Sequence, residues 1–117
     1  MNELAVGGMS ISKDVLDKIV RFAAEKVEGV AVVGRDQVAG SVLSLFASHA
    51  EDVSGIEAAV IDDKLNVKLG IAAFFGYPFD ELADNVRFAV ADAIAAQVGV
   101  DVAGVDIAID SVVFPKA

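Results

Sequence analysis

The stretch that decides the fold is residues 64–115, which read KLNVKLGIAAFFGYPFDELADNVRFAVADAIAAQVGVDVAGVDIAIDSVVFP. Apolar and polar residues alternate over residues 65–71, which is the pattern of a strand with one buried face. A helical pattern follows over residues 78–99, and alternation returns over residues 105–109. Because a helix separates the two strands, a crossover connection predicts that they lie parallel in one sheet.

The helix of this unit has clear start and stop signals. Pro78 suits the beginning of a helix, carboxylates follow in the first turns, and Gly99 suits its end. Its predicted core face consists of Leu82, Val86, Ala89, Val90, Ala93 and Ile94. The opposite face carries Phe88, Ala91 and Ala95, so the second half of the helix is apolar almost all round. We expect a second surface to cover it.

A second long helix is predicted near the N-terminus. Ser12 can cap its first amides, and Gly29 is predicted to end it in a left-handed conformation. The apolar positions predicted to form one face of this helix are Val15, Leu16, Ile19, Val20, Phe22, Ala23 and Val27.

Shorter elements fill the middle of the chain. Gly29, Gly55 and Gly104 are each predicted to lead into an extended segment, the first of them residues 30–33. Residues 56–61 and the strand from Leu65 form a predicted hairpin with Asp62-Asp63 at its turn. Residues 36–50 have the spacing of a short, weak helix.

These patterns predict a single α+β domain over residues 1–117. We expect a small mixed sheet of three to four strands, two long helices on one face, and a short variable helix between them. The length of 117 residues fits one hydrophobic core.

Composition excludes several classes of function. The net charge of -9 repels nucleic acid phosphates and anionic lipid head groups, so we expect neither nucleic acid binding nor direct membrane insertion. Cysteine is absent, which excludes disulfides, thiolate nucleophiles and cysteine-based zinc sites. The longest uncharged stretch, residues 37–50, is too short to span a bilayer. A cytoplasmic location is the default expectation.

No motif predicts catalysis, a metal or a cofactor. Residues 99–104 match the first part of a phosphate loop, but Val105-Asp106 replaces the required Lys-Ser/Thr. His49 with Glu51 and Asp52 could in principle bind a divalent metal, although a solvated histidine explains it better. The carboxylate groups at 62–63, 80–84 and 101–110 fit a turn, a helix start and the outer face of a strand, so we expect no metal site.

Residues 74–79 hold four of the eight aromatic side chains. These rings either close the end of the sheet against the helices or form an aromatic mouth that anchors a partner or an apolar ligand. Phe75 and Tyr77 are therefore candidate interface residues.

The ordered set of motifs resembles the alkaline shock protein family, the envelope stress response proteins of Gram-positive bacteria. The segments that carry the resemblance are Ile11 to Leu16, Val27 to Ala31, Leu65 to Gly76, Asn85-Val86 and Val105 to Pro115. The resemblance implies a compact α+β domain in a cytoplasmic, non-enzymatic protein with a role in envelope homeostasis. It also implies a possible partner, a small membrane-anchor protein, and it carries over no catalytic residues.

The leading hypothesis is a scaffold or adaptor that associates with itself through Phe88, Ala91 and Ala95, assisted by Phe75 and Tyr77. One alternative is a small-molecule or lipid binding module that uses the aromatic mouth at residues 74–79. Another is a metal-assisted hydrolase centred on His49, which would require a bound divalent metal.

Overall fold

The structure, a computed structural model, describes residues 3–34 and 55–114. Within these residues the chain forms a two-stranded sheet, a four-stranded sheet and two helices, which confirms the predicted α+β class. The elements in order are β1 (Glu3–Val6), β2 (Met9–Ser12), α1 (Lys13–Glu25), β3 (Val30–Val33), β4 (Ile56–Ile61), β5 (Lys64–Phe74), α3 (Phe79–Gln97) and β6 (Val102–Val113). The predicted short helix at 36–50, and His49, Glu51 and Asp52, lie outside the described residues.

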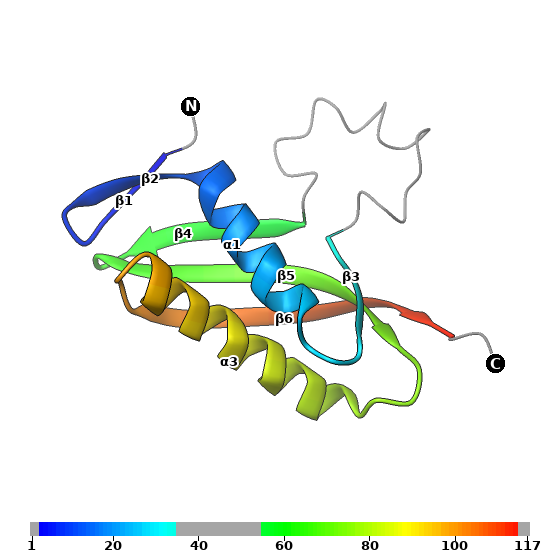
Figure 1. The fold of residues 1–117 in the computed structure, drawn as a ribbon. Helices are drawn as coiled ribbons and strands as arrows, with labels where there is room; N and C mark the ends of the chain where they lie inside the picture. The colour runs from blue at the N-terminus through cyan, green and yellow to red at the C-terminus, as the bar shows by residue number, and fades with distance from the viewer. Residues whose placement is uncertain (1–2, 35–54, 115–117) are drawn as a thin grey trace, which may run out of the picture.

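Strand β5 is the centre of the larger sheet (Figure 1). Its first half pairs antiparallel with β4, and its second half pairs antiparallel with β3. Gly70 marks the change of partner, because its N–H donates to the Gly55 carbonyl at 3.1 Å and its carbonyl accepts from the Gly34 N–H at 2.9 Å. Strand β6 pairs with β5 in parallel over residues 65–74, as the crossover predicted.

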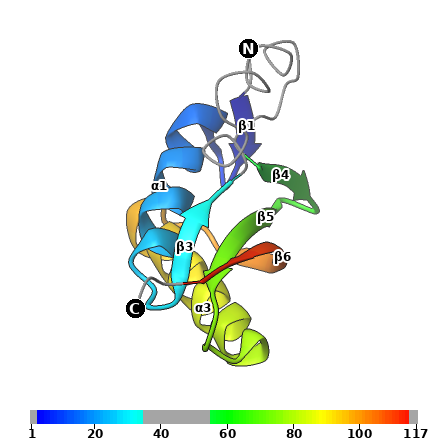
Figure 2. The same cartoon turned by 90° about the vertical axis from the view of Figure 1, so that its right-hand side faces the viewer.

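Both helices lie on the same face of this sheet, as Figure 2 shows and as the sequence predicted. The core between the layers contains Leu16 and Val20 of α1 and the four positions Leu82, Val86, Val90 and Ile94 of α3. They pack with buried side chains of β5 in one cluster. Every turn of α3 thus contributes to one stripe facing the sheet.

Two predicted boundaries are wrong. Helix α1 ends at Glu25 rather than at Gly29, because Lys26 and Val27 donate to carbonyls three residues back, at 3.3 and 3.1 Å, and tighten the last turn. Strand β6 begins at Val102, so Gly104 does not lead into it but lies within it, opposite Asn66. Gly29 does have a positive φ, of 104°, immediately before β3.

The predicted cap and hairpin are confirmed. The Ser12 hydroxyl accepts from the amides of Asp14 at 3.1 Å and Val15 at 3.4 Å. Asp62 and Asp63 connect β4 to β5 with φ of 54° and 59°. Positive φ at both central residues defines the tight turn whose twist suits a hairpin, and aspartate tolerates it better than most residues.

The N-terminal hairpin of β1 and β2 was not predicted from the sequence. Its turn is Gly7-Gly8, with φ of 61° and 77°. The Gly7 N–H donates to Asp63 Oδ1 at 3.0 Å, so the turns of the two hairpins meet. Val6 is buried in the main core. The hairpin is therefore a packed part of the domain.

Candidate protein-interaction surface

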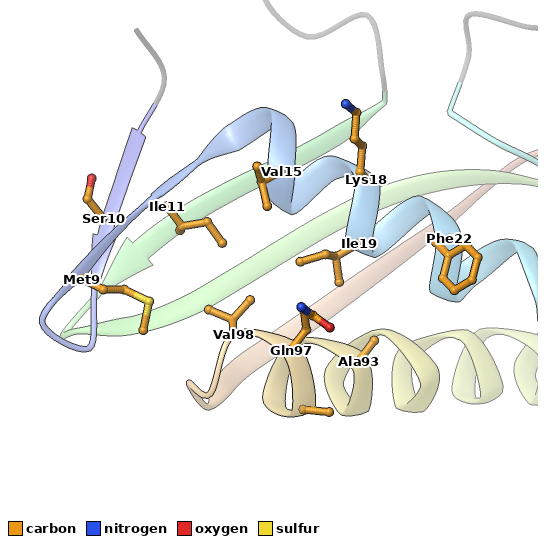
Figure 3. Close-up of a pocket in the computed structure, with 11 residues that line it drawn as sticks. Met9, Ser10, Ile11, Val15, Lys18, Ile19, Phe22, Ala93, Gln97 and Val98 are labelled. Carbon is orange, nitrogen blue, oxygen red and sulfur yellow. The ribbon is translucent and has the colours of Figure 1, made fainter.

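A groove of about 550 Å³ runs along the outer surface of the helical layer, between α1 and the last turns of α3 (Figure 3). Strand β2 closes one end. Its wall is mostly apolar, and the side chains that line it are Met9, Ser10, Ile11, Val15, Lys18, Ile19, Phe22, Ala93, Ala96, Gln97 and Val98.

The groove exists because α1 has two apolar stripes. One stripe, including Leu16 and Val20, is buried against the sheet. The other consists of Val15, Ile19 and Phe22, which are spaced four and three residues apart and so share a face. Val15 is 48% exposed and Phe22 is 62% exposed. Val15 and Phe22 thus lie at the exposed border of the apolar face of α1, whereas Leu16 and Val20 lie at its buried centre.

The rim of the groove carries positive charge. Lys18 lines it, and Lys26 places its Nζ 4.3 Å from the centroid of the Phe22 ring. An ammonium at this distance is attracted by the face of the ring. The groove thus combines an apolar floor with basic side chains.

Phe88 projects from α3 outside this groove and is 74% exposed. Asp84 and Asp92 lie one turn before and one turn after it, so the ring is bracketed by carboxylates on its own face of the helix. Ala95 is also exposed, whereas Ala91 is half-buried against the core. Of the predicted interface on α3, Phe88 and Ala95 thus lie at the surface.

The other two candidate residues lie elsewhere. Phe75 follows β5 and stacks on Phe114 beyond the end of β6, with ring centroids 5.0 Å apart. Its N–H also donates to the Val113 carbonyl at 2.8 Å. Tyr77 instead packs against Gly29, in the connection from α1 to β3, since a β-carbon built at Gly29 would lie 2.9 Å from its Cγ. The aromatic residues of segment 74–79 therefore lie at two places, with Phe75 at the end of the sheet and Tyr77 beside Gly29.

Tyr77 also makes the contact that changes its titration. Its hydroxyl donates to Glu28 Oε2 at 3.0 Å. The carboxylate accepts this bond only from the neutral phenol, so the bond raises the pKa of Tyr77 above its ordinary value of 10.0, with smaller contributions from burial and from the charge of Glu28.

The carboxylate groups do not converge. Across residues 3–34 and 55–114, no three His, Cys, Asp or Glu side chains gather in an arrangement that could hold a metal ion. The phosphate-loop fragment at 99–104 leads into β6, not into a helix whose N-terminus could bind phosphate. Neither described helix is long and apolar enough to cross a membrane.

Comparison with known proteins assigns the family. The model of the alkaline shock protein 23 family, which is described as having a cell envelope-related function, matches residues 1–114. This protein belongs to that family. The assignment confirms the resemblance to the alkaline shock proteins, and it covers both helices and all six described strands. A search of curated proteins gives no match.

Several solved structures show a distant similarity to this chain. They are variants of MamM: one is 14% identical, covers 84% of this chain and 94% of that chain, and has a TM-score of 0.49. A zinc form of a MamM CTD variant is also 14% identical, covers 88% of this chain and 86% of that chain, and has a TM-score of 0.49.

Proposed function

We propose that this protein is a non-enzymatic, envelope-related scaffold or adaptor that acts through protein-protein contacts and associates with itself through its helical layer. The family supplies the relation to the cell envelope. The proposed self-association is supported by the exposure of Phe88, which is 74% exposed on the same helical layer that holds the apolar groove. A large apolar ring beside a groove that can receive it favours contact with another protein surface.

The two features complement each other in charge as well as in shape. Phe88 is bracketed by Asp84 and Asp92, whereas the groove is bordered by Lys18 and Lys26. If Phe88 of one copy enters the groove of another, Asp84 and Asp92 of the first copy come close to the lysines that border the groove of the second. A two-fold arrangement would make this contact twice and close the assembly as a dimer.

The alanines near Phe88 favour the same arrangement. Ala91 and Ala95 follow Phe88 by three and seven residues, so they extend its face along α3. Their small side chains allow a neighbouring helix to approach closely. Phe75 and Tyr77 belong to other surfaces, so the proposed contact does not include them.

The test is the mass of the protein in solution, measured by light scattering and sedimentation equilibrium. Phe88→Ser should weaken self-association at least tenfold, because burying a phenylalanine contributes roughly 2 kcal/mol. Ala95→Glu should have a similar effect by steric and charge conflict. Phe114→Ser is the matched control, because it also removes an exposed ring but lies off the helical layer. An oligomer that survives Phe88→Ser unchanged would exclude this interface.

Charge exchange tests the pairing itself. Lys18→Asp and Asp92→Lys should each weaken the dimer, since each places like charges across the contact. The double variant should recover a large part of the lost affinity, because the pair is restored with its signs reversed. Additive losses in the double variant would argue that Lys18 and Asp92 do not meet.

The same proposal puts the protein in the cytoplasm and gives it a membrane-anchor protein as a partner. Its net charge of -9 opposes direct adsorption to anionic lipid, so contact with the envelope would go through that partner.

A second candidate function is small-molecule or lipid binding. The groove between α1 and α3 favours it, because its volume of about 550 Å³ is within the usual range for ligand sites. The aromatic mouth is less suited, because Phe75 and Tyr77 lie on different surfaces. A thermal-shift screen with fatty acids and phospholipids tests it; stabilisation that Phe22→Ser removes would support ligand binding in the groove.

A further inference from the structure

Strand β6 has one edge that no other described strand occupies. It pairs with β5 along its length, while β3 and β4 pair with the opposite edge of β5. In Figure 1, β6 accordingly forms the outer border of the sheet. An edge strand of 12 residues presents a row of backbone donors and acceptors that can bind an added strand.

One side-chain contact shows which backbone groups face outward. Arg87 of α3 donates from Nε to the Val105 carbonyl at 3.0 Å, so the backbone polar groups of Val105 point away from β5. The register is regular from Val105, opposite Val67, to Ile109, opposite Ile71. Because strand residues alternate, Ile107 and Ile109 direct their N–H and carbonyl groups to the same free edge.

Arg87 covers only the first part of this edge. Its guanidinium also pairs with Asp84, which fixes it over Val105. Beyond Val105 no described side chain is hydrogen-bonded to the outward groups of Ile107 and Ile109. The register shift after Ile109 then ends the regular stretch. The open edge is therefore short, and it is centred on residues 107–109.

The charges along the strand indicate what can bind there. Asp101 precedes β6, and Asp106 and Asp110 are exposed within it. Two antiparallel copies of this strand would bring the aspartates of one copy opposite or diagonal to those of the other, which is unfavourable. The Asp110 carboxylate leans over Gly70 of β5, so an added strand with lysine or arginine at alternate positions would place positive charge beside Asp106.

We propose that the free edge of β6 binds an extended, basic segment of a partner protein, which joins the sheet as an additional strand. The backbone groups of Ile107 and Ile109 supply the hydrogen bonds, and Asp106 selects for positive charge. This site goes beyond the helical contact proposed above and does not depend on it. An adaptor would then hold its own copy on one surface and a basic segment on another.

The probe is a fluorescent peptide of nine residues with alternating lysine and valine. Its binding to the protein is measured by fluorescence anisotropy. It should bind, and a version with glutamate in place of lysine should bind at least tenfold more weakly. A third version, N-methylated at alternate residues, keeps every charge but lacks the amide donors of one edge. This peptide should also bind at least tenfold more weakly than the unmodified one. Equal binding of the N-methylated peptide would show charge attraction alone and overturn the proposal.

Variants locate the site on the protein. Ile107→Pro removes an outward N–H that β5 does not use, and an edge strand accepts proline at such a position. This variant should bind the peptide at least tenfold more weakly. Asp106→Lys should weaken peptide binding too, whereas Glu81→Lys makes the same charge change on an exposed position of α3 and should leave peptide binding nearly unchanged. Phe88→Ser should leave peptide binding intact whatever it does to self-association. If Ile107→Pro instead dissociates an oligomer in the absence of peptide, a second copy occupies the edge and the proposed partner is wrong.

Discussion

At the scale of single residues, Tyr77 shows how one side chain joins the two helices. It lies between β5 and α3, packs against Gly29 in the connection from α1 to β3, and donates its hydroxyl to Glu28. Leu82 of α3 reaches the same place, since its Cδ1 would lie 3.1 Å from a β-carbon at Gly29. Glycine at position 29 therefore serves two purposes: it adopts a positive φ and leaves room for these side chains.

The hydrogen bond to Glu28 predicts an alkaline titration. Tyr77 should ionise above pH 10.0, and Glu28→Gln should lower its pKa toward the ordinary value. Because the folded-state pKa is raised, the bond stabilises the fold at and below pH 10.0, and this contribution is lost as the pH rises through the raised pKa. Ultraviolet absorbance of the phenolate measures the titration cleanly, because the chain has one tyrosine and no tryptophan. A pKa that is the same in the protein and in Glu28→Gln would contradict the bond.

At the scale of elements, the strand-helix-strand unit could be predicted because its periodicities are long and its ends are marked. The hairpin of β1 and β2 was missed because strands of four residues are too short to establish an alternation, although Gly7-Gly8 between Val6 and Met9 was a usable signal. The end of α1 was misplaced because residues 26–28 are compatible with a helix, and hydrogen bonds rather than residue types decide where it stops.

The N-terminal hairpin should depend on the docking of its turn. A β-carbon at Gly7 would lie 2.8 Å from Val100 Cγ1, whereas one at Gly8 would have no described atom within 4 Å. Both residues have positive φ, so Gly8→Ala should cost about 1–2 kcal/mol of unfolding free energy from strain alone. Gly7→Ala should cost roughly 1–3 kcal/mol more, because the methyl group displaces Val100. Urea unfolding of the two variants compares them directly, and equal losses would mean that the turn does not pack on Val100.

At the scale of the whole molecule, the two proposed contact surfaces differ in kind. The helical layer offers apolar side chains with complementary charges, and the β6 border offers backbone groups beside carboxylates. Phe88 and Ala95 could be predicted as surface candidates because the second half of α3 has more apolar positions than one face needs. The groove could not be predicted from the sequence, because it depends on how α1 and α3 lie relative to each other. The spacing of Val15, Ile19 and Phe22 was its only local sign.

The central position of β5 has a consequence for how the molecule opens. Strands β3, β4 and β6 each pair with β5, and among the described residues none of the three pairs with another. Releasing β5 therefore separates all of them together. In hydrogen-deuterium exchange, the amides of β5 that bond to its neighbours should exchange last and at one common rate, which equals that of global opening. The amides of β1 and β2 should exchange sooner, because their sheet can fray while β5 stays in place; earlier exchange in β5 than in β1 would contradict this order.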